Sequence, residues 1–537
     1  MAICMNRRGF VETLGALAVA ARSGAATAVK MSPGLAEELR SQRVRGEEFD
    51  PVERSIAELS RAQADGSASA ESLTQSYLQR IDRYDRQGPK LGAVLAVNPD
   101  ALAAARALDA GRRAGKVLGP LHGIPILLKD NIETRDPLPT TAGSLALASA
   151  RHSQDAPVAA RLRAAGAVVL GKANLSEWAN FRSSRAVSGW SAVGGQTRCP
   201  YDPTRNPSGS SAGPAAGAAA NLCAAAVGSE TDGSVLAPAS INGLVGLKPT
   251  VGLVSSVGVV PITSRQDTTG PLTRSVADAA LLLSVMADPT AHWDGVGSLE
   301  SLPAGLRLGV LPPPASSHPQ VLKQAQDWFK LLQREGFTLV DVPSPSGWAT
   351  LLEDEGEVLL YDFKADLNAY LARFNGRLPV GTLADLIEFN IEHAAAEMPF
   401  FGQELFEQSQ ACGPRTSPAY EKALRHIIEV ADTNGLSNIF ASYQLDALVA
   451  SGNGPAELID QVWGDQYENS GGWPPMCSAA AVAGYPSLTV PAGFVAGLPV
   501  GIHFVCPRFR DGRLLQIGRR FERARNARQP PKLEGRI

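Results

Sequence analysis

The sequence predicts an α/β protein with a mixed, largely parallel β-sheet, and two observations support this fold class. Short apolar runs that are typical of buried strands alternate along the chain with longer segments that are typical of helices. This alternation favours a largely parallel sheet with helical connections. The chain also has 537 residues and 44% hydrophobic side chains, which is enough to bury a large core.

The individual elements can be placed by residue range. Strands are expected at 123–130, 167–172, 306–311, 446–451 and 487–491. Helices are expected at about 50–113, 156–166, 275–287, 320–336, 352–372 and 418–442. The proline-rich stretch 311–319 is interpreted as a rigid loop rather than as a domain boundary.

Charge and motif content argue against several classes of function. A net charge of −3 gives no basic surface for nucleic acid, and no apolar run reaches transmembrane length. The chain has no C-x-x-C pairing, no H-E-x-x-H, no P-loop and no G-x-G-x-x-G. We therefore expect neither a metal nor a cofactor. Glu392, His393 and Glu397 could share one helix face, but a solvated face is the default interpretation.

The first 28 residues resemble a twin-arginine signal peptide. Arg7 and Arg8 precede an apolar run from Leu14 to Ala21, and residues 26–28 form an A-x-A cleavage pattern. We therefore expect residues 29–537 to form the mature protein, periplasmic or secreted, with a cytoplasmic location as the alternative. Cleavage would remove one of the six cysteines. Five cannot all pair, so no essential disulfide is expected.

Two Gly/Ser-rich turns lie between residues 207 and 250. The first, GSSAG, contains Ser210 and Ser211, and the second, SETDGS, ends at Ser234. Upstream, Lys129 follows the apolar run IPILL. Two serines and a lysine with no histidine nearby in sequence indicate acyl transfer with lysine as the base. Each residue alone has a simpler interpretation: an ordinary turn, or a lysine paired with Asp130.

The second turn has the composition of an oxyanion-binding loop. Glycine allows close backbone approach to a substrate, so TDGS predicts that the amides of Thr231, Asp232, Gly233 and Ser234 point inward. Between the two turns, the small-residue run from Pro214 through Val227 predicts one buried helix that holds the turns in a fixed relation.

Together these segments resemble the amidase signature family. Lys129 matches the lysine of its K-D segment, Ser210 its cis-serine and Ser234 its nucleophile, and the Ser210–Ser234 spacing is the family's spacing. The resemblance covers about residues 50 to 530, with the signature core at about 120–290. It implies one large domain, with helices on both faces of the sheet.

Within the family the similarity is greatest to bacterial peptide amidases, through GKANLSEWANFR (171–182) and GSETDGS (228–234). The chain departs from the family at Ala212-Gly213-Pro214, and residues 452–476 match poorly. A lysine is a base near pH 7 only if burial lowers its pKa from about 10.4 to about 7–8. Neutral Lys129 would then take a proton from Ser210, and Ser210 one from Ser234.

The resemblance implies a serine amidohydrolase that releases ammonia from the C-terminal amide of peptides, without an obligate protein partner. The alternatives are a broad aliphatic or aryl amidase, an amidotransferase A-type subunit that needs a partner, and a silent binding protein on the same fold. Residues 209–213 also fit G-x-S-x-G, the nucleophile motif of α/β-hydrolases. That motif needs a histidine later in the chain, and His503 is the last histidine of this sequence. Ser211 is expected to hydrogen-bond within the site. Aromatic residues in 398–406 and 463–473 are expected either to form a substrate cleft or to be ordinary packing.

Overall fold

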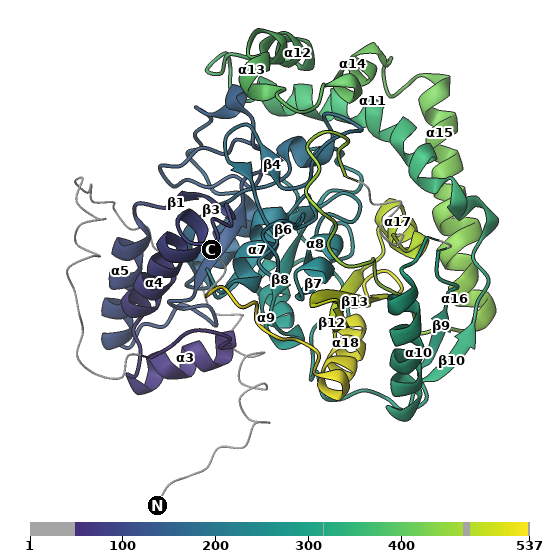
Figure 1. Cartoon of the computed structure of the whole chain (residues 1–537), viewed down its shortest axis with the longest axis horizontal. Coiled ribbons are helices and arrows are strands. Elements are labelled where there is room, and N and C mark those ends of the chain that lie inside the picture. The colour runs from purple at the N-terminus through teal and green to yellow at the C-terminus, as the bar shows by residue number, and fades with distance from the viewer. Residues whose placement is uncertain (1–48, 315, 466–472, 535–537) are drawn as a thin grey trace, which may run out of the picture.

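A mixed sheet of eleven strands forms the centre of the molecule, seen in Figure 1 as the arrows between layers of helices. The computed structural model describes residues 49–314, 316–465 and 473–534. The strands are β1 (Val94–Val97), β2 (Pro125–Lys129), β3 (Val168–Ala173), β6 (Ala225–Glu230), β7 (Val245–Lys248), β8 (Thr268–Thr273), β9 (Arg307–Val310), β10 (Thr338–Asp341), β11 (Ala447–Ser451), β12 (Ser487–Val495) and β13 (Leu498–Val505). A separate two-stranded sheet joins β4 (Trp190–Ser191) to β5 (Gly195–Gln196).

The strand order is β1-β3-β2-β6-β8-β7-β12-β13-β11-β9-β10. Parallel pairs occur in two blocks, β3-β2-β6 and β11-β9-β10. The strands between these blocks pair antiparallel, and so does the edge strand β1. The predicted α/β fold with a mixed sheet is confirmed, and its first parallel block contains two of the strands that surround the predicted site.

Helices cover both faces of this sheet. They are α3 (Ile56–Asp65), α4 (Ala70–Arg80), α5 (Ala101–Arg113), α6 (Pro157–Ala164), α7 (Ala212–Ala219), α8 (Leu236–Ile241), α9 (Val276–Met286), α10 (Pro319–Arg334), α11 (Leu351–Ala372), α12 (Leu383–Glu392), α13 (Ala394–Glu397), α14 (Glu404–Ala411), α15 (Pro418–Ile428), α16 (Ser437–Tyr443), α17 (Pro475–Val482) and α18 (Asp511–Arg525). Strand β12 shows the two faces. Thr489 lies beside Gly246 of β7 and Gly501 of β13, and residues of α8 lie against the same two glycines. Leu488 and Val490 instead lie against Gly518 of α18. Alternate residues of a strand point to opposite faces, so α8 and α18 cover opposite sides.

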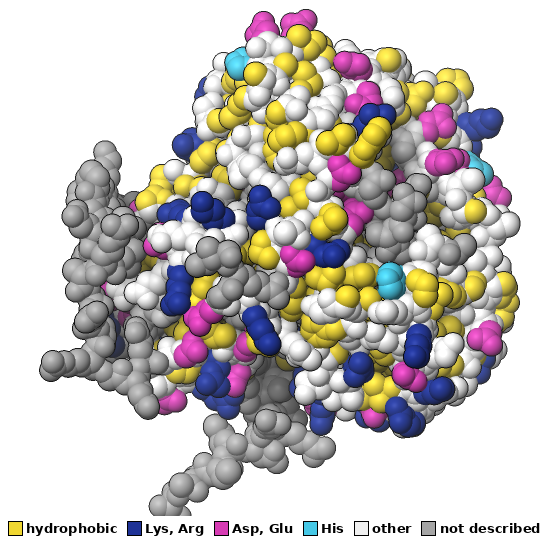
Figure 2. Space-filling model, viewed as in Figure 1, with side chains coloured by type: hydrophobic (Ala, Val, Ile, Leu, Met, Phe, Trp, Pro, Cys, Tyr) yellow, Lys and Arg dark blue, Asp and Glu magenta, His cyan; other side chains and the backbone are white. Residues whose placement is uncertain are grey.

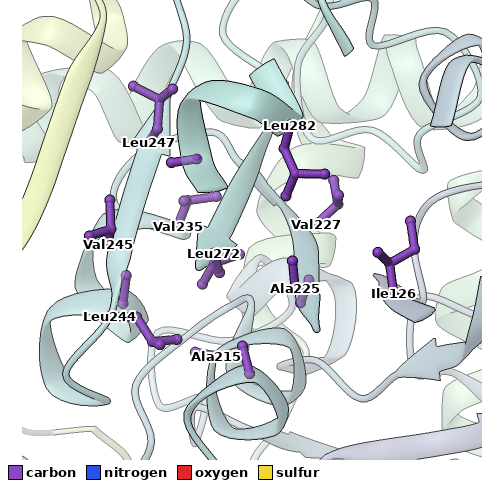
Figure 3. Packing of buried hydrophobic residues seen from close by; sticks show 14 of the residues in the cluster. Ile126, Ala215, Ala225, Val227, Val235, Leu244, Val245, Leu247, Leu272 and Leu282 are labelled. Atoms are coloured by element: carbon purple, nitrogen blue, oxygen red, sulfur yellow. The ribbon is translucent and has the colours of Figure 1, made fainter. Parts of the chain in front are cut away.

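The main core lies between the central strands and these helices. Figure 3 shows Ala225 and Val227 of β6 beside Leu272 of β8, with Ala215 of α7 and Leu282 of α9 packed nearby. All five side chains are fully buried. Burial of this apolar surface is the main stabilising contribution to such a fold, and it makes the central strands a rigid frame for the loops at their ends.

The predicted helix from Pro214 through Val227 is wrong in its second half. Helix α7 ends at Ala219, Asn221 adopts a left-handed conformation with φ of 56°, and the chain then enters β6. The run of alanines in β6 is buried between β2 and β8. A short apolar run fits a buried strand as well as a helix, and here the sheet pairing decides.

Two other long helix predictions are interrupted. Within 50–113, the four-residue strand β1 pairs with β3 at the sheet edge. Within 418–442, a π-helical segment at Glu429–Leu436 separates α15 from α16, with Gly435 outside helical conformation. The strands expected at 123–130, 167–172, 306–311, 446–451 and 487–491 are all confirmed within a few residues.

The predicted signal peptide lies outside the described residues, and so does most of the aromatic segment 463–473. No helix in the described part of the chain is long and apolar enough to cross a membrane. Figure 2 shows Lys and Arg side chains interspersed with Asp and Glu over the face in view, without a large area of one sign.

Candidate active site

The candidate site forms where two neighbouring parallel strands end. Strand β2 ends at Lys129, and its neighbour β6 ends at Ser229 and Glu230. The carboxyl ends of parallel strands meet at one edge of a sheet, which is where ligand sites of open α/β sheets form. The pairing therefore brings together two chain segments that are about a hundred residues apart in sequence.

Lys129 is completely buried and its amine contacts two serines. Nζ lies 2.7 Å from Ser210 Oγ, 2.9 Å from Ser229 Oγ and 3.2 Å from the Ser229 carbonyl oxygen. Burial lowers the pKa of Lys129 to about 7, against the opposing charges of Asp267 and Glu230. A lysine with this pKa is partly neutral near pH 7, and a neutral amine can accept a proton from a hydroxyl.

Ser210 and Ser211 occupy the turn that leads into α7, and the Gly209–Ser210 peptide bond is cis. The Ser211 hydroxyl donates to the Ser229 carbonyl oxygen at 3.0 Å and accepts from the Ser229 N–H at 3.2 Å. The Ser211 N–H donates to the Ser234 carbonyl oxygen at 3.1 Å. Ser211 thus joins the first turn to β6 and to the second turn. It was expected to form hydrogen bonds within the site, and the structure shows these bonds.

Ser234 lies two residues before α8 begins at Leu236. It keeps 8% of its surface exposed, whereas Ser210 and Lys129 have none, so Ser234 is the most accessible of these three residues. Glu230 accepts hydrogen bonds from the N–H groups of Val235 and Leu236, the first amides of the helix. These two N–H groups therefore already donate to Glu230, so any backbone N–H that is free to bind a substrate belongs to an earlier residue of the second turn.

The four residues Thr231–Ser234 are called the oxyanion loop below. Within the described residues, none of their backbone N–H groups donates a hydrogen bond. Gly233 has a φ of 76°, a left-handed conformation that favours glycine. The Thr231 hydroxyl donates to Asp267 at 2.6 Å, so its side chain is held from behind the loop. Free amides next to a serine are the arrangement that stabilises a developing oxyanion.

Sequence reasoning missed Ser229 and Asn131. The Asn131 side-chain amide donates to Ser229 Oγ at 2.8 Å, so this hydroxyl is held by both Asn131 and Lys129. Both residues lie within two positions of the ends of β2 and β6. The signal that could have identified them is the pairing of these strands, because residues at neighbouring carboxyl ends lie side by side.

The competing candidates do not form sites in the structure. His503 is fully buried on β13, and neither ring nitrogen has a hydrogen-bonding partner among residues 49–314, 316–465 and 473–534. Glu397 is buried and accepts from the Leu145 N–H, while His393 stacks on Phe389. Within the described ranges no three His, Cys, Asp or Glu side chains are grouped to hold a metal.

The aromatic segment 398–406 contributes mainly to packing. Phe401 is nearly buried and lies edge-on to Trp190. Phe406 is completely buried and stacks on Phe363 with ring centroids 5.1 Å apart. Of the two interpretations of these aromatic residues, ordinary packing therefore holds for Phe401 and Phe406, whereas Phe400 remains 39% exposed.

Comparison with known proteins gives a consistent result. The family model described as Amidase matches residues 72–515. A probable amidase of Arabidopsis thaliana is 38% identical, over 94% of this chain and 96% of its own length. The A subunit of the glutamyl-tRNA(Gln) amidotransferase of Chloroflexus aurantiacus is 35% identical, over 86% of this chain and 94% of its own.

Solved structures agree. Native peptide amidase from Stenotrophomonas maltophilia is 45% identical with a TM-score of 0.83, covering 90% of this chain and 99% of that one. A complex of peptide amidase with the competitive inhibitor chymostatin is 46% identical with a TM-score of 0.85, covering 90% of this chain and all of that one. This chain belongs to the amidase signature family of serine hydrolases, and it is an amidase close to the peptide amidases.

Proposed function

We propose that Ser234 is the nucleophile of this amidase, that Ser210 relays its proton and that neutral Lys129 is the base. The observation that supports this most is the contact of the buried Lys129 amine with Ser210 Oγ at 2.7 Å. Ser211 links the two serine turns through its backbone and side chain. The free amides of the oxyanion loop lie beside the accessible hydroxyl.

The proposed reaction has two halves. The Ser234 Oγ forms a bond to the amide carbon while its proton passes to Ser210, whose own proton passes to Lys129. The loop amides stabilise the negative oxygen of the tetrahedral intermediate. The relay then returns a proton to the departing nitrogen, the C–N bond breaks and ammonia leaves. Water, activated by the same relay, hydrolyses the acyl-enzyme and restores Ser234.

The substrate class we propose is the C-terminal carboxamide of peptides. The peptide amidase structures support it, since they are 45–46% identical to this chain over nine tenths of its length. A broad aliphatic or aryl amidase would use the same three residues. We also propose that the chain acts without an obligate protein partner, unlike an amidotransferase A subunit.

Ammonia release from a blocked dipeptide amide tests this function. The purified chain is expected to release ammonia and leave a dipeptide acid whose internal bond is intact, as read by product mass. Ser234→Ala is expected to release none, although it folds. Cleavage of the internal bond, or equal ammonia from the variant, would contradict the proposal. Ammonia from glutamine only after a second protein is added would favour the amidotransferase alternative.

We further propose that residues 1–28 direct export of the folded protein. The support is the Arg7-Arg8 pair ahead of a short apolar run and an A-x-A pattern. Expression of the full chain in a bacterium is expected to give a periplasmic protein whose mass corresponds to residues 29–537. Replacing both arginines by lysine is expected to keep it in the cytoplasm. Export unchanged by that replacement would contradict the assignment.

A further inference from the structure

Two buried carboxyl groups interact at the oxyanion loop. One belongs to Asp232, two residues before the proposed nucleophile, and the other to Glu355 in the first turns of α11. Both oxygens of Asp232 are buried, and in the described part of the chain neither meets a donor in good hydrogen-bonding geometry, although Ser478 and Trp473 lie near enough to favour the ionised form. A proton on Glu355 gives Asp232 a further donor, because the two carboxyl groups interact directly.

Burial and mutual repulsion allow this pair of carboxyl groups only one negative charge near neutral pH. Burial and the charge of Asp232 raise the pKa of Glu355 well above its ordinary value. Burial also raises the pKa of Asp232, but Ser478, Glu355 and Lys248 favour its ionised form. Glu230, Cys477 and Asp511 are the other titratable groups that act on the pair or on its neighbour Lys248. Glu355 is therefore the neutral donor and Asp232 the carboxylate that accepts.

The same pair is tied to the loop through neighbouring residues. The Gln266 side-chain amide donates to Glu355 Oε1 at 2.5 Å and lies 3.4 Å from the Thr231 carbonyl oxygen. Asp267 accepts from the Thr231 hydroxyl at 2.6 Å with one oxygen. With its other oxygen it accepts from the backbone N–H groups of residues 262 and 263. The first two loop residues are thus held from α11 and from segment 262–267.

Trp473 packs against the oxyanion loop. Its indole lies against Gly233, where an added Cβ would be 3.2 Å from the ring, and its N–H donates to Ser478 at 3.0 Å. The Trp473 ring therefore lies against the loop backbone at Gly233, and its indole also favours the ionised form of Asp232.

We propose that Asp232 and Glu355 are positioning residues that share one proton and thereby fix the oxyanion loop with its free amides toward the substrate carbonyl. This rests on the proposed function of Ser234 and of the loop. Loss of the shared proton at alkaline pH places two like charges against each other at the loop, and the loop shifts. The pair thus determines catalytic rate rather than substrate binding.

Three variants on one helix test this inference. Glu355→Gln keeps a neutral donor for Asp232 and an acceptor for Gln266, and its kcat is expected to stay within about threefold of wild type. Glu355→Ala removes the donor, and its kcat is expected to fall by about 10²-fold, the loss seen when an oxyanion donor is removed, with little change in KM. Glu357→Gln, at an exposed position two residues further on, is the matched control and is expected to match wild type.

The pH profile separates positioning from a merely structural role. In wild type, kcat is expected to fall on the alkaline side as Glu355 ionises, and Glu355→Gln is expected to lack that fall. An alkaline limb that persists in Glu355→Gln, or a kcat of Glu355→Ala equal to wild type, would overturn the inference. If Glu355→Ala does not fold, the comparison of Glu355→Gln with wild type still decides.

These measurements use any carboxamide that wild type hydrolyses, so they do not depend on the peptide substrate class. An active Ser234→Ala variant would show that the proposed function fails. An inactive Ser234→Ala variant beside an unaffected Glu355→Ala variant would show that only the positioning role fails.

Discussion

Lys129 and Lys172 show how the surroundings of a buried amine determine its role. Both side chains are completely buried. Lys172 lies 3.3 Å from Asp130, so its charge is balanced by a carboxylate. The Lys129 amine has serine oxygens around it and, in the described part of the chain, no carboxylate within 4.0 Å. Burial lowers the pKa of both amines, but only the amine of Lys129 contacts the hydroxyl of a predicted site serine, so of the two it is the one suited to act as a base.

Ser229→Ala is the residue-level prediction. The substitution removes a hydroxyl that contacts the Lys129 amine at 2.9 Å and the Asn131 amide at 2.8 Å. The amine loses an orienting partner, so we expect kcat to fall by at least about tenfold, with KM nearly unchanged. Steady-state kinetics on a carboxamide measure both. Ser284→Ala on exposed α9 surface is the control, and a Ser229→Ala variant as fast as wild type would contradict the assigned contact.

The sequence patterns identified several residues that the structure places in one cluster, while their catalytic roles stay predictions. Lys129, Ser210 and Ser211 were predicted and lie in one hydrogen-bonded cluster, and Ser234 is linked to it through the Ser211 N–H. Ser229 was not predicted to contact Lys129, because that contact depends on β2 and β6 being neighbours. Local sequence patterns do not specify which strands pair.

At the scale of elements, the connection from α7 to β6 explains why the site residues meet. Gly228 lies in β6 directly under the first serine turn. The helix predicted from Pro214 through Val227 was wrong in its second half because the run AAAV at 224–227 has a composition that fits either a helix or a buried strand. The left-handed Asn221 and the pairing of β6 with β2 and β8 decide in favour of a strand.

Gly228→Ala is the element-level prediction. An added Cβ would lie 2.5 Å from Ser211 Oγ and 2.8 Å from Leu272 Cδ1, so the turn or the strand must shift. We expect a loss of about 1–3 kcal/mol in the free energy of unfolding from overpacking, together with a fall in kcat. Urea unfolding and kinetics measure the two effects.

The control is Gly356→Ala on α11, where an added Cβ meets nothing within 4 Å. There alanine is expected to stabilise the helix by about 0.5–1 kcal/mol. Equal stability and activity of both glycine variants would show that the close approach at Gly228 is unimportant.

At the scale of the whole molecule, the buried side chain of Arg182 attaches the helical region 383–411 to the part of the chain that contains the candidate site. Arg182 lies 2.9 Å from Glu177, donates to the carbonyl oxygens of Phe401 and Gly402, and stacks over the Phe401 ring at 4.3 Å. Glu397 accepts from the N–H of Leu145 on the other side. The sequence predicted aromatic residues here but did not indicate the buried arginine around which they pack.

Arg182→Met is the corresponding prediction. It leaves Glu177 buried without its cation and two carbonyl oxygens without donors, so we expect unfolding to be easier by about 3–5 kcal/mol. Arg54→Met is the matched control, because the Arg54–Glu58 pair is exposed and is expected to contribute less than about 1 kcal/mol. Urea unfolding midpoints compare the two, and equal shifts would contradict the structural role of Arg182.

The most direct test of the central claim, that neutral Lys129 is the base, is the dependence of kcat/KM on pH. A lysine with its pKa lowered to about 7 is active above that pH and inactive once protonated, so kcat/KM is expected to fall as pH decreases through about 7. Burial also raises the pKa of Asp267 to about 7, and the temperature dependence separates the two groups. Amine ionisation absorbs much heat and carboxyl ionisation little. With Lys129 as the base, the acidic limb of the profile is expected to move to lower pH on warming. A profile that stays flat below pH 7, or a limb that does not move with temperature, would show that Lys129 is not the base.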